Sequence, residues 1–333
     1  MKKFCLKAAV YLLLFALLPA VLSAAVDPFN VFHPLSIRDN GVEVNKNFVK
    51  MTYILANPDR FDTLLFGSSR VGDMHVEKLR GMHCYNMTYS NGVPAEHLEN
   101  LRTLLKNDAA PKRILLGVDV LSYTNDPAGH RADGLRAPYE LSREKPLAFW
   151  SLYLDPTITW RAVVTTMRGH TPTPGFRERF YNFGWNHDYD TPTGERVDSH
   201  GAFALVSSVR RMPQTLDEIA QFVRLCRDNG IDLTVFTVPI YADTFDEALE
   251  ADYALFLRKL ADITPYYNFT GHNRITDDPM QFYDPSHPSA QTGDAVIACL
   301  CGEKPDDELY NAGFGRLVTA ENADAFVSML TGG

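Results

Sequence analysis

The sequence predicts an α/β protein with a mostly parallel sheet covered by helices on both faces. This architecture is a three-layer α/β/α sandwich. Short apolar runs bounded by turn residues recur along the chain, with helical segments between them. One of these runs, residues 113–121, is a continuous apolar run of the kind typical of strands buried on both faces, and residues 231–240 are the clearest strand in the chain. The 333 residues, 45% of them hydrophobic, also suffice for a large core.

The first half of the predicted sheet alternates regularly. Leu98, Leu101, Leu104 and Leu105 recur at helical spacing and predict a helix between the second and third strands. The predicted elements are a strand at 62–67, a short helix at 76–81, a strand at 82–89, a helix at 94–108 and a strand at 113–121.

The second half continues the alternation. The segment 215–230 carries acids early and Asn-Gly at its end, which indicates a helix. The predicted elements that follow are a strand at 231–240, a helix at 246–263, a short strand at 266–271 and a final helix within 282–300. Parallel sheets of this kind bind ligands beyond the carboxyl ends of their strands.

A long segment, about 122–212, separates the third strand from the next helix and contains all three tryptophans. A lid, a substrate platform and a packed subdomain are all compatible with it. No Gly/Ser-rich linker marks a boundary, so residues 27–333 are expected to form one domain with this segment as an insertion.

The first 26 residues differ from the rest. Lys2, Lys3 and Lys7 precede an uncharged apolar run at residues 8–26. This arrangement indicates a signal peptide, for which the small residues around Ala24 offer a cleavage site, or an N-terminal membrane anchor. Both alternatives place the remaining chain outside the cytoplasm, in the periplasm or at the outer face of the cytoplasmic membrane.

Composition excludes several classes of function. The formal net charge of −9 disfavours nucleic acid as a partner, since binding it needs clustered Lys and Arg. No phosphate loop, dinucleotide fingerprint or H-E-x-x-H motif is present, so no cofactor is predicted. No metal site is predicted either, because the segment 186–190 ("NHDYD") is better interpreted as an acidic turn.

Two short polar motifs stand where chemistry is expected. "GSSR" (67–70) follows the first strand, and "DPSH" (284–287) precedes the last helix. In a parallel sheet both fall on the carboxyl edge. Asp284 can fix the tautomer of His287, which is then free to act as a base toward a serine hydroxyl.

At these motifs the chain resembles the SGNH (GDSL-type) hydrolase superfamily. That family has a nucleophile turn after its first strand and a C-terminal D-x-x-H. The resemblance implies a flavodoxin-like sheet, Ser69 as nucleophile, His287 as base and Asp284 as the acid of a catalytic triad.

The intermediate family blocks match less closely. "NMTYSNG" (86–92) resembles the block that supplies an oxyanion donor, placed at Gly92 here, although a gap-free match puts it at Asn91. Asp119 stands where the family usually has an asparagine. An ionised carboxylate cannot donate to an oxyanion, so Asp119 is expected to orient either Arg70 or the loop after Ser69. Asn91, Gly92, Asp119 and Arg70 together form the predicted oxyanion and substrate-binding group.

"GSS", combined with the N-terminal segment and "VDPF" (26–29), is similar to one branch of the family. Its members include proteins of D-alanyl transfer to teichoic acid and of exopolysaccharide O-acetylation. The resemblance implies a serine esterase or O-acyltransferase acting on acylated envelope polysaccharide, with a membrane-bound O-acyltransferase as a partner. The alternative is a non-catalytic envelope protein that docks a polysaccharide or that acyltransferase. The distance from Ser69 to His287 distinguishes the two.

Overall fold

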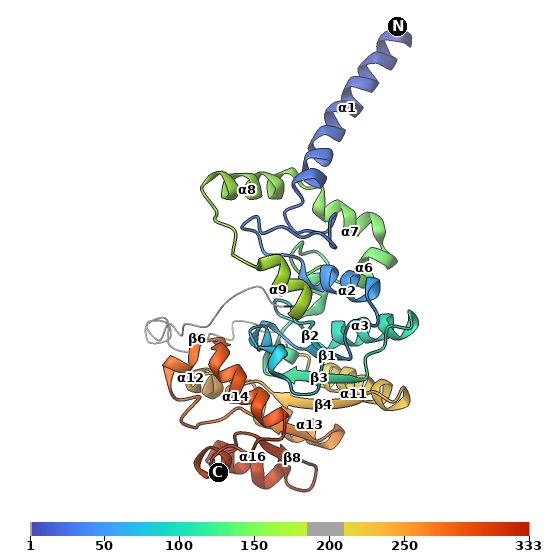
Figure 1. Cartoon of the computed structure of the whole chain (residues 1–333). Helices are drawn as coiled ribbons and strands as arrows, with labels where there is room; N and C mark the ends of the chain where they lie inside the picture. Colours follow the sequence, from blue (N-terminus) through green and yellow to red (C-terminus); the bar gives the residue numbers. More distant parts are fainter. Residues whose placement is uncertain (1, 185–209, 333) are drawn as a thin grey trace. The chain divides into compact units, whose positions relative to one another are not determined.

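The computed structural model of the chain describes residues 2–184 and 210–332 (Figure 1). The predicted acidic turn at 186–190 lies outside the described residues. The chain divides into two compact units: a helical unit, Met1–Tyr53 with Ala128–Glu178, and a sheet unit, Ile54–Pro127 with Arg179–Gly333. The sequence predicted a single domain from residue 27, so this division differs from the expectation. Much of the predicted insertion belongs with the N-terminal residues instead.

The helical unit shows why the chain divides in this way. The buried Asn45 side chain donates to the carbonyl of Ala137 at 2.9 Å and to the hydroxyl of Tyr153 at 2.6 Å. The Phe48 ring lies 4.8 Å from that of Phe149. These contacts join two distant segments of the chain around their own small core. Its helices are α1 (Lys2–Val26), α2 (Lys46–Ala56), α6 (Tyr139–Glu144), α7 (Pro146–Tyr153) and α8 (Pro156–Met167).

The N-terminal helix α1 is 25 residues long and includes Pro19. Directly after it, the Asp27 carboxylate accepts hydrogen bonds from the backbone N–H groups of Val31, Phe32 and His33, which fixes the turn that leaves the helix. Within residues 2–184 and 210–332, no helix combines the length and the apolar character that a membrane span requires.

The sheet unit is an α/β structure with a six-stranded, mostly parallel sheet, as predicted. The strand order is β2-β1-β3-β4-β5-β8; the first five are parallel, and β8 runs antiparallel to β5. The order 2-1-3-4-5 is that of flavodoxin-like sheets, in which the winding reverses between β1 and β3. The strands are β1 (Thr63–Phe66), β2 (Cys84–Asn86), β3 (Arg113–Val118), β4 (Asp232–Thr237), β5 (Tyr266–Asn268) and β8 (Arg316–Val318).

Helices pack on both faces of the sheet. Successive strand residues point to opposite faces. Phe66 contacts His97 of α3 (Pro94–Lys106) and Phe222 of α11 (Met212–Asp228), with ring centroids 5.5 and 5.9 Å apart. The neighbouring Leu65 instead shares a core cluster with Val296 of α14 (Ala290–Leu300). All four residues of β1 are buried, which explains their uninterrupted apolar character.

Three predicted elements differ in detail. The helix expected at 246–263 is two helices, α12 (Ala242–Glu250) and α13 (Tyr253–Ile263), because Asp252 adopts a left-handed conformation with φ 62°. The short helix at 76–81 is a single 3-10 turn, η2 (Val76–Lys78). Residues 282–288 form a small antiparallel ribbon, β6 (Phe282–Asp284) with β7 (His287–Pro288), where only a turn was expected.

Candidate active site

Ser69 stands at the carboxyl end of β1, beside the reversal point between β1 and β3. It opens the 3-10 turn η1 (Ser69–Val71), whose N-cap is Ser68. The Ser68 hydroxyl accepts the N–H of Arg70 at 3.4 Å. Gly67 is required before this turn, since a Cβ there would lie 2.6 Å from Cγ2 of Val71. The apolar strand therefore ends in a tight polar turn that exposes Ser69 where ligands bind in such sheets.

Asp284 and His287 are brought together by the β6–β7 ribbon, in which they are register partners. The Asp284 carboxylate accepts the backbone N–H groups of Ser286 and His287 at 2.8 and 2.9 Å. Its two oxygens also lie 2.9 and 3.0 Å from Nδ1 of the His287 ring. A carboxylate only accepts hydrogen bonds, so this geometry assigns the proton to Nδ1 and leaves a lone pair on Nε2.

The predicted triad is assembled in space. Nε2 of His287 lies 2.9 Å from Oγ of Ser69, within hydrogen-bond distance. With Nδ1 protonated, the Ser69 hydroxyl is the donor and the imidazole is the acceptor. The side chains of His287 and Asp284 are 23% and 30% exposed, so the site is accessible to a substrate. Nucleophile, base and orienting acid form one hydrogen-bonded chain.

The electrostatics of Asp284 match its orienting position. Partial burial by itself raises the pKa of this carboxyl group. The hydrogen bond and charge of His287, together with the two backbone N–H groups, outweigh burial and hold the pKa of Asp284 below its ordinary value. The carboxylate is therefore ionised at neutral pH.

Arg70 and Asp119, predicted within the oxyanion and substrate-binding group, are too buried to touch a substrate. Their side chains are 0% and 2% exposed. Asp119 accepts the Ser68 hydroxyl at 3.0 Å and the N–H of Leu121 at 2.7 Å. Its Oδ2 lies 3.5 Å from Nη1 of Arg70. The two residues thus support the nucleophile turn from behind, since buried charges persist only when paired.

The two predicted oxyanion donors, Gly92 and Asn91, differ in the hydrogen bonding of their backbone N–H groups. The N–H of Gly92 donates to the carbonyl of Tyr89 at 3.0 Å and is therefore already engaged. Asn91, the gap-free alternative, has the left-handed φ of 58°. Among the described residues, neither the Asn91 N–H nor the Ser69 N–H has a hydrogen-bond acceptor. These two backbone groups are the candidate donors to a developing oxyanion.

The absence of a side chain at Gly92 allows the backbone of the nucleophile turn to pack closely against it. A Cβ at this position would lie 2.5 Å from the carbonyl oxygen of Gly67 and 3.0 Å from Cε1 of His97. We expect Gly92→Ala to displace the nucleophile turn, to reduce stability by about 1–3 kcal/mol and to lower the esterase rate. Urea unfolding and p-nitrophenyl acetate hydrolysis measure both effects. Gly129→Ala is the control because a Cβ there meets nothing within 4 Å. Wild-type behaviour of Gly92→Ala would contradict the packing role.

Two supports of the site were not predicted. The buried Thr244 on α12 donates through Oγ1 to the carbonyl of Pro285 at 3.0 Å. Ser286 receives the Nε–H of Arg70 on its carbonyl at 3.0 Å. Ser286 lies inside the "DPSH" motif, of which only Asp284 and His287 were assigned roles, whereas nothing in the sequence around Thr244 marks it.

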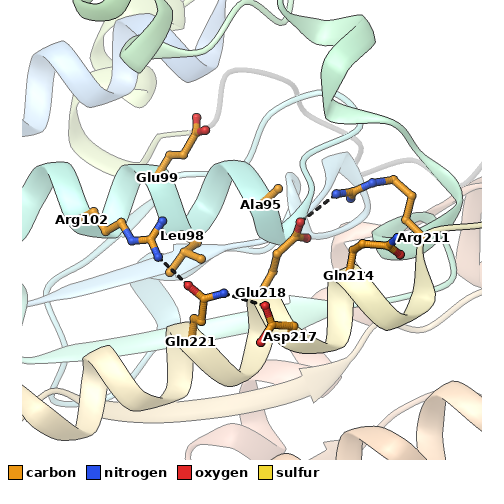
Figure 2. A pocket seen from close by; sticks show the side chains of 9 residues that line it. All are labelled: Ala95, Leu98, Glu99, Arg102, Arg211, Gln214, Asp217, Glu218 and Gln221. Carbon is orange, nitrogen blue, oxygen red and sulfur yellow. Dashed lines mark hydrogen bonds and ion pairs between the residues drawn. The ribbon is translucent and has the colours of Figure 1, made fainter.

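A separate pocket lies between α3 and α11 and has a volume of about 350 Å³ (Figure 2). No triad residue lines it. Its polar side chains engage one another: Arg102 donates to Gln221 at 2.6 Å, Gln221 donates to Asp217 at 2.8 Å, and Arg211 pairs with Glu218 at 2.8 Å. Most of these groups therefore have partners, whereas Nη1 of Arg211 and Oε2 of Glu218 are buried without a hydrogen-bond partner among the described residues.

Burial makes two of the cysteines poor rival nucleophiles. Desolvation raises the pKa of the Cys226 thiol to about 12 and that of Cys299 to about 11, so both are protonated at neutral pH. In the described part of the chain, no group of three or more His, Cys, Asp or Glu side chains is arranged to hold a metal ion. Ser69 is the nucleophile candidate that has a base beside it.

Comparisons with known proteins do not extend this picture. Family models, curated proteins and solved structures all returned no match to the chain. Functional assignment therefore depends on the geometry of the site and on the sequence motifs that form it.

Proposed function

We propose that the chain is an exported serine esterase or O-acyltransferase of the SGNH hydrolase type. Its substrates would be acyl esters of a cell-envelope or exported polysaccharide. The observation that carries the proposal is the hydrogen-bonded chain from Ser69 Oγ to His287 Nε2 (2.9 Å) and from His287 Nδ1 to Asp284 (2.9 Å). This arrangement supports nucleophilic acyl transfer.

In the proposed reaction, Ser69 Oγ attacks the acyl carbonyl while its proton passes to Nε2 of His287. Asp284 remains ionised and stabilises the imidazolium through Nδ1. The negative charge on the carbonyl oxygen is stabilised by the N–H groups of Ser69 and Asn91, each worth about 3 kcal/mol in such sites. His287 then protonates the leaving alcohol, and the acyl group remains on Ser69.

The second half of the proposed reaction reverses these roles. Water, or a sugar hydroxyl, gives its proton to His287 and attacks the acyl-Ser69 carbonyl. The tetrahedral intermediate collapses, the acyl group leaves with the acceptor, and the proton returns to Ser69. Water as acceptor makes the protein an esterase, and a sugar hydroxyl makes it an O-acyltransferase.

The strand order supports the SGNH-type assignment, because β1 and β3 carry Ser69 and Asp119 at the reversal point of a flavodoxin-like sheet. Export is supported by the lysines and the apolar run of residues 2–26. The polysaccharide ester, and a membrane-bound O-acyltransferase as partner, are supported by sequence resemblance alone.

The non-catalytic alternative predicts no close approach of nucleophile and base. Side chains directed apart would favour a docking module for a polysaccharide or an acyltransferase. The separation of 2.9 Å between Ser69 Oγ and His287 Nε2 instead favours the enzyme.

Labelling with a fluorophosphonate probe tests the proposal directly. We expect the folded protein to be labelled on Ser69, as identified by peptide mapping, because the probe reacts with base-activated serines. Heat-denatured protein and Ser69→Ala serve as controls and are expected to remain unlabelled. Folded wild-type protein without label on Ser69 would contradict an enzymatic function.

A further inference from the structure

We propose that Arg70 is a positioning residue whose buried guanidinium sets the distance between the nucleophile turn and the acid–base ribbon, with Asp119 holding it in place. The inference rests on the proposed function and adds a residue that acts through Ser69 and His287 without touching the substrate. Its basis is a set of contacts that link three separate segments of the chain.

The first link joins the two halves of the triad. Arg70 directly follows Ser69, and its Nε–H donates to the carbonyl of Ser286 at 3.0 Å, with the Ser286 hydroxyl at 3.3 Å. Ser286 immediately precedes His287 and is two residues after Asp284. Arg70, which is next to the nucleophile, is therefore bonded to Ser286, which is next to the base, across 216 positions of sequence.

The second link fixes the other end of the guanidinium. Nη1 of Arg70 lies 3.5 Å from Oδ2 of Asp119, which also accepts the Ser68 hydroxyl at 3.0 Å. The Ser68 oxygen in turn accepts the backbone N–H of Arg70 at 3.4 Å. Asp119 is itself held after β3 by the N–H of Leu121. Two hydrogen bonds and one ion pair of 3.5 Å thus keep Ser68, Arg70 and Asp119 in mutual contact behind the nucleophile.

A guanidinium suits this position. Its Nε–H donates to the Ser286 carbonyl, while Nη1, at a fixed angle in the same plane, lies in ion-pair range of the Asp119 carboxylate at 3.5 Å. A lysine ammonium keeps the charge but places its donors at one point. A buried ion pair contributes little net stability compared with apolar side chains of the same volume. The contribution of Arg70 is therefore geometric: it holds the Ser69–His287 contact at 2.9 Å.

A second anchor supports this interpretation and supplies a matched variant. Thr244 holds the carbonyl of Pro285 at 3.0 Å, so adjacent carbonyls of the ribbon are fixed by different elements of the sheet unit. Thr244→Val removes that anchor with almost no change in volume and no change in charge.

The test compares Arg70→Lys, Arg70→Met and Thr244→Val in the full-length protein. We measure kcat and KM for p-nitrophenyl acetate and the rate of fluorophosphonate labelling at Ser69. A displacement of about 1 Å between nucleophile and base costs about 100-fold in rate. We expect Arg70→Lys to lose about this factor in kcat and in labelling, with KM unchanged, and Arg70→Met to lose more. Thr244→Val should lose about tenfold in kcat, because one anchor remains.

Asn268→Ala is the control for a general loss of stability. Asn268 is buried on β5 and donates to the carbonyls of Thr270 and Gly313, without contacting the triad. The Asn268→Ala substitution should lower the melting temperature, while kcat of the folded fraction stays unchanged. If Arg70→Met does not fold, Arg70→Lys and Thr244→Val carry the test.

Three outcomes are decisive. Wild-type kcat and labelling in Arg70→Lys would overturn the inference, as would a loss explained entirely by the unfolded fraction, as in Asn268→Ala. Failure of wild-type protein to label at Ser69 would overturn the proposed function itself, so the two failures are distinguishable.

Discussion

Ser69→Ala is expected to lower kcat/KM for p-nitrophenyl acetate by about 10⁴–10⁶-fold, or about 5–8 kcal/mol of transition-state stabilisation. The substitution removes the attacking oxygen but leaves the turn and its buried supports intact. Circular dichroism and the melting temperature should therefore remain close to wild type. The measurement is steady-state hydrolysis with the purified, folded protein.

His287→Ala is expected to cause a loss of similar size, because the hydroxyl 2.9 Å away loses its proton acceptor. The double variant should be no slower than either single variant, since nucleophile and base act as one unit. Asp284→Asn should lose about 10⁴-fold, because an amide allows the wrong imidazole tautomer. Losses that add in the double variant, or single variants that hydrolyse at the wild-type rate, would contradict the triad.

His97→Leu is expected to reduce the loss of stability between pH 7.5 and 4.5. His97 lies on α3, 1% exposed, between the rings of Phe66 and Tyr89 at 5.5 and 5.4 Å. Among the described residues, neither ring nitrogen has a hydrogen-bond partner. Burial therefore lowers the pKa of His97 to about 3.

The sign of the effect follows from proton uptake. Between pH 6.5, the ordinary pKa of histidine, and about 3, the unfolded chain binds a proton at residue 97 and the folded chain does not. Each pH unit in this window lowers the free energy of unfolding by about 1.4 kcal/mol. Leucine has a similar volume and no titratable group, so His97→Leu should lose about 2–3 kcal/mol less than wild type between pH 7.5 and 4.5.

Urea unfolding at both pH values measures the difference between the two proteins. His83→Leu replaces an exposed histidine and serves as the control for removing an imidazole as such. Parallel loss of stability in His97→Leu and wild type would show that His97 is hydrated or hydrogen-bonded in the folded protein.

The sequence predicted the five parallel strands because their signal is local, whereas β6, β7 and β8 were not predicted. Leu64, Leu65 and Phe66 are apolar for the same reason that they form a buried strand, and this reason can be read in a short window. The triad was also predictable, since Ser69, Asp284 and His287 follow or precede recognisable elements of a parallel sheet.

Other features depend on contacts between distant segments and leave no local pattern. The break at Asp252 and the joining of residues 1–53 with 128–178 are examples. The Tyr89 carbonyl accepts the N–H of Gly92 and not that of Asn91, and the spacing of residues in the sequence does not contain that information. The buried position of Arg70 was equally hidden, because a charged residue in a turn is usually exposed.

The two halves of the site are separated by 218 positions in the chain, which has a consequence for biosynthesis. A ribosome completes the β1 turn long before it reaches the β6–β7 ribbon, so a nascent chain carries its serine without its imidazole. Pairing over such a separation is late in folding because closing the loop costs entropy before any contact compensates. In the proposed enzyme, ester-cleaving activity therefore emerges only after the C-terminal part of the sheet unit has folded. Chains that are incomplete, or still unfolded, therefore do not cleave esters.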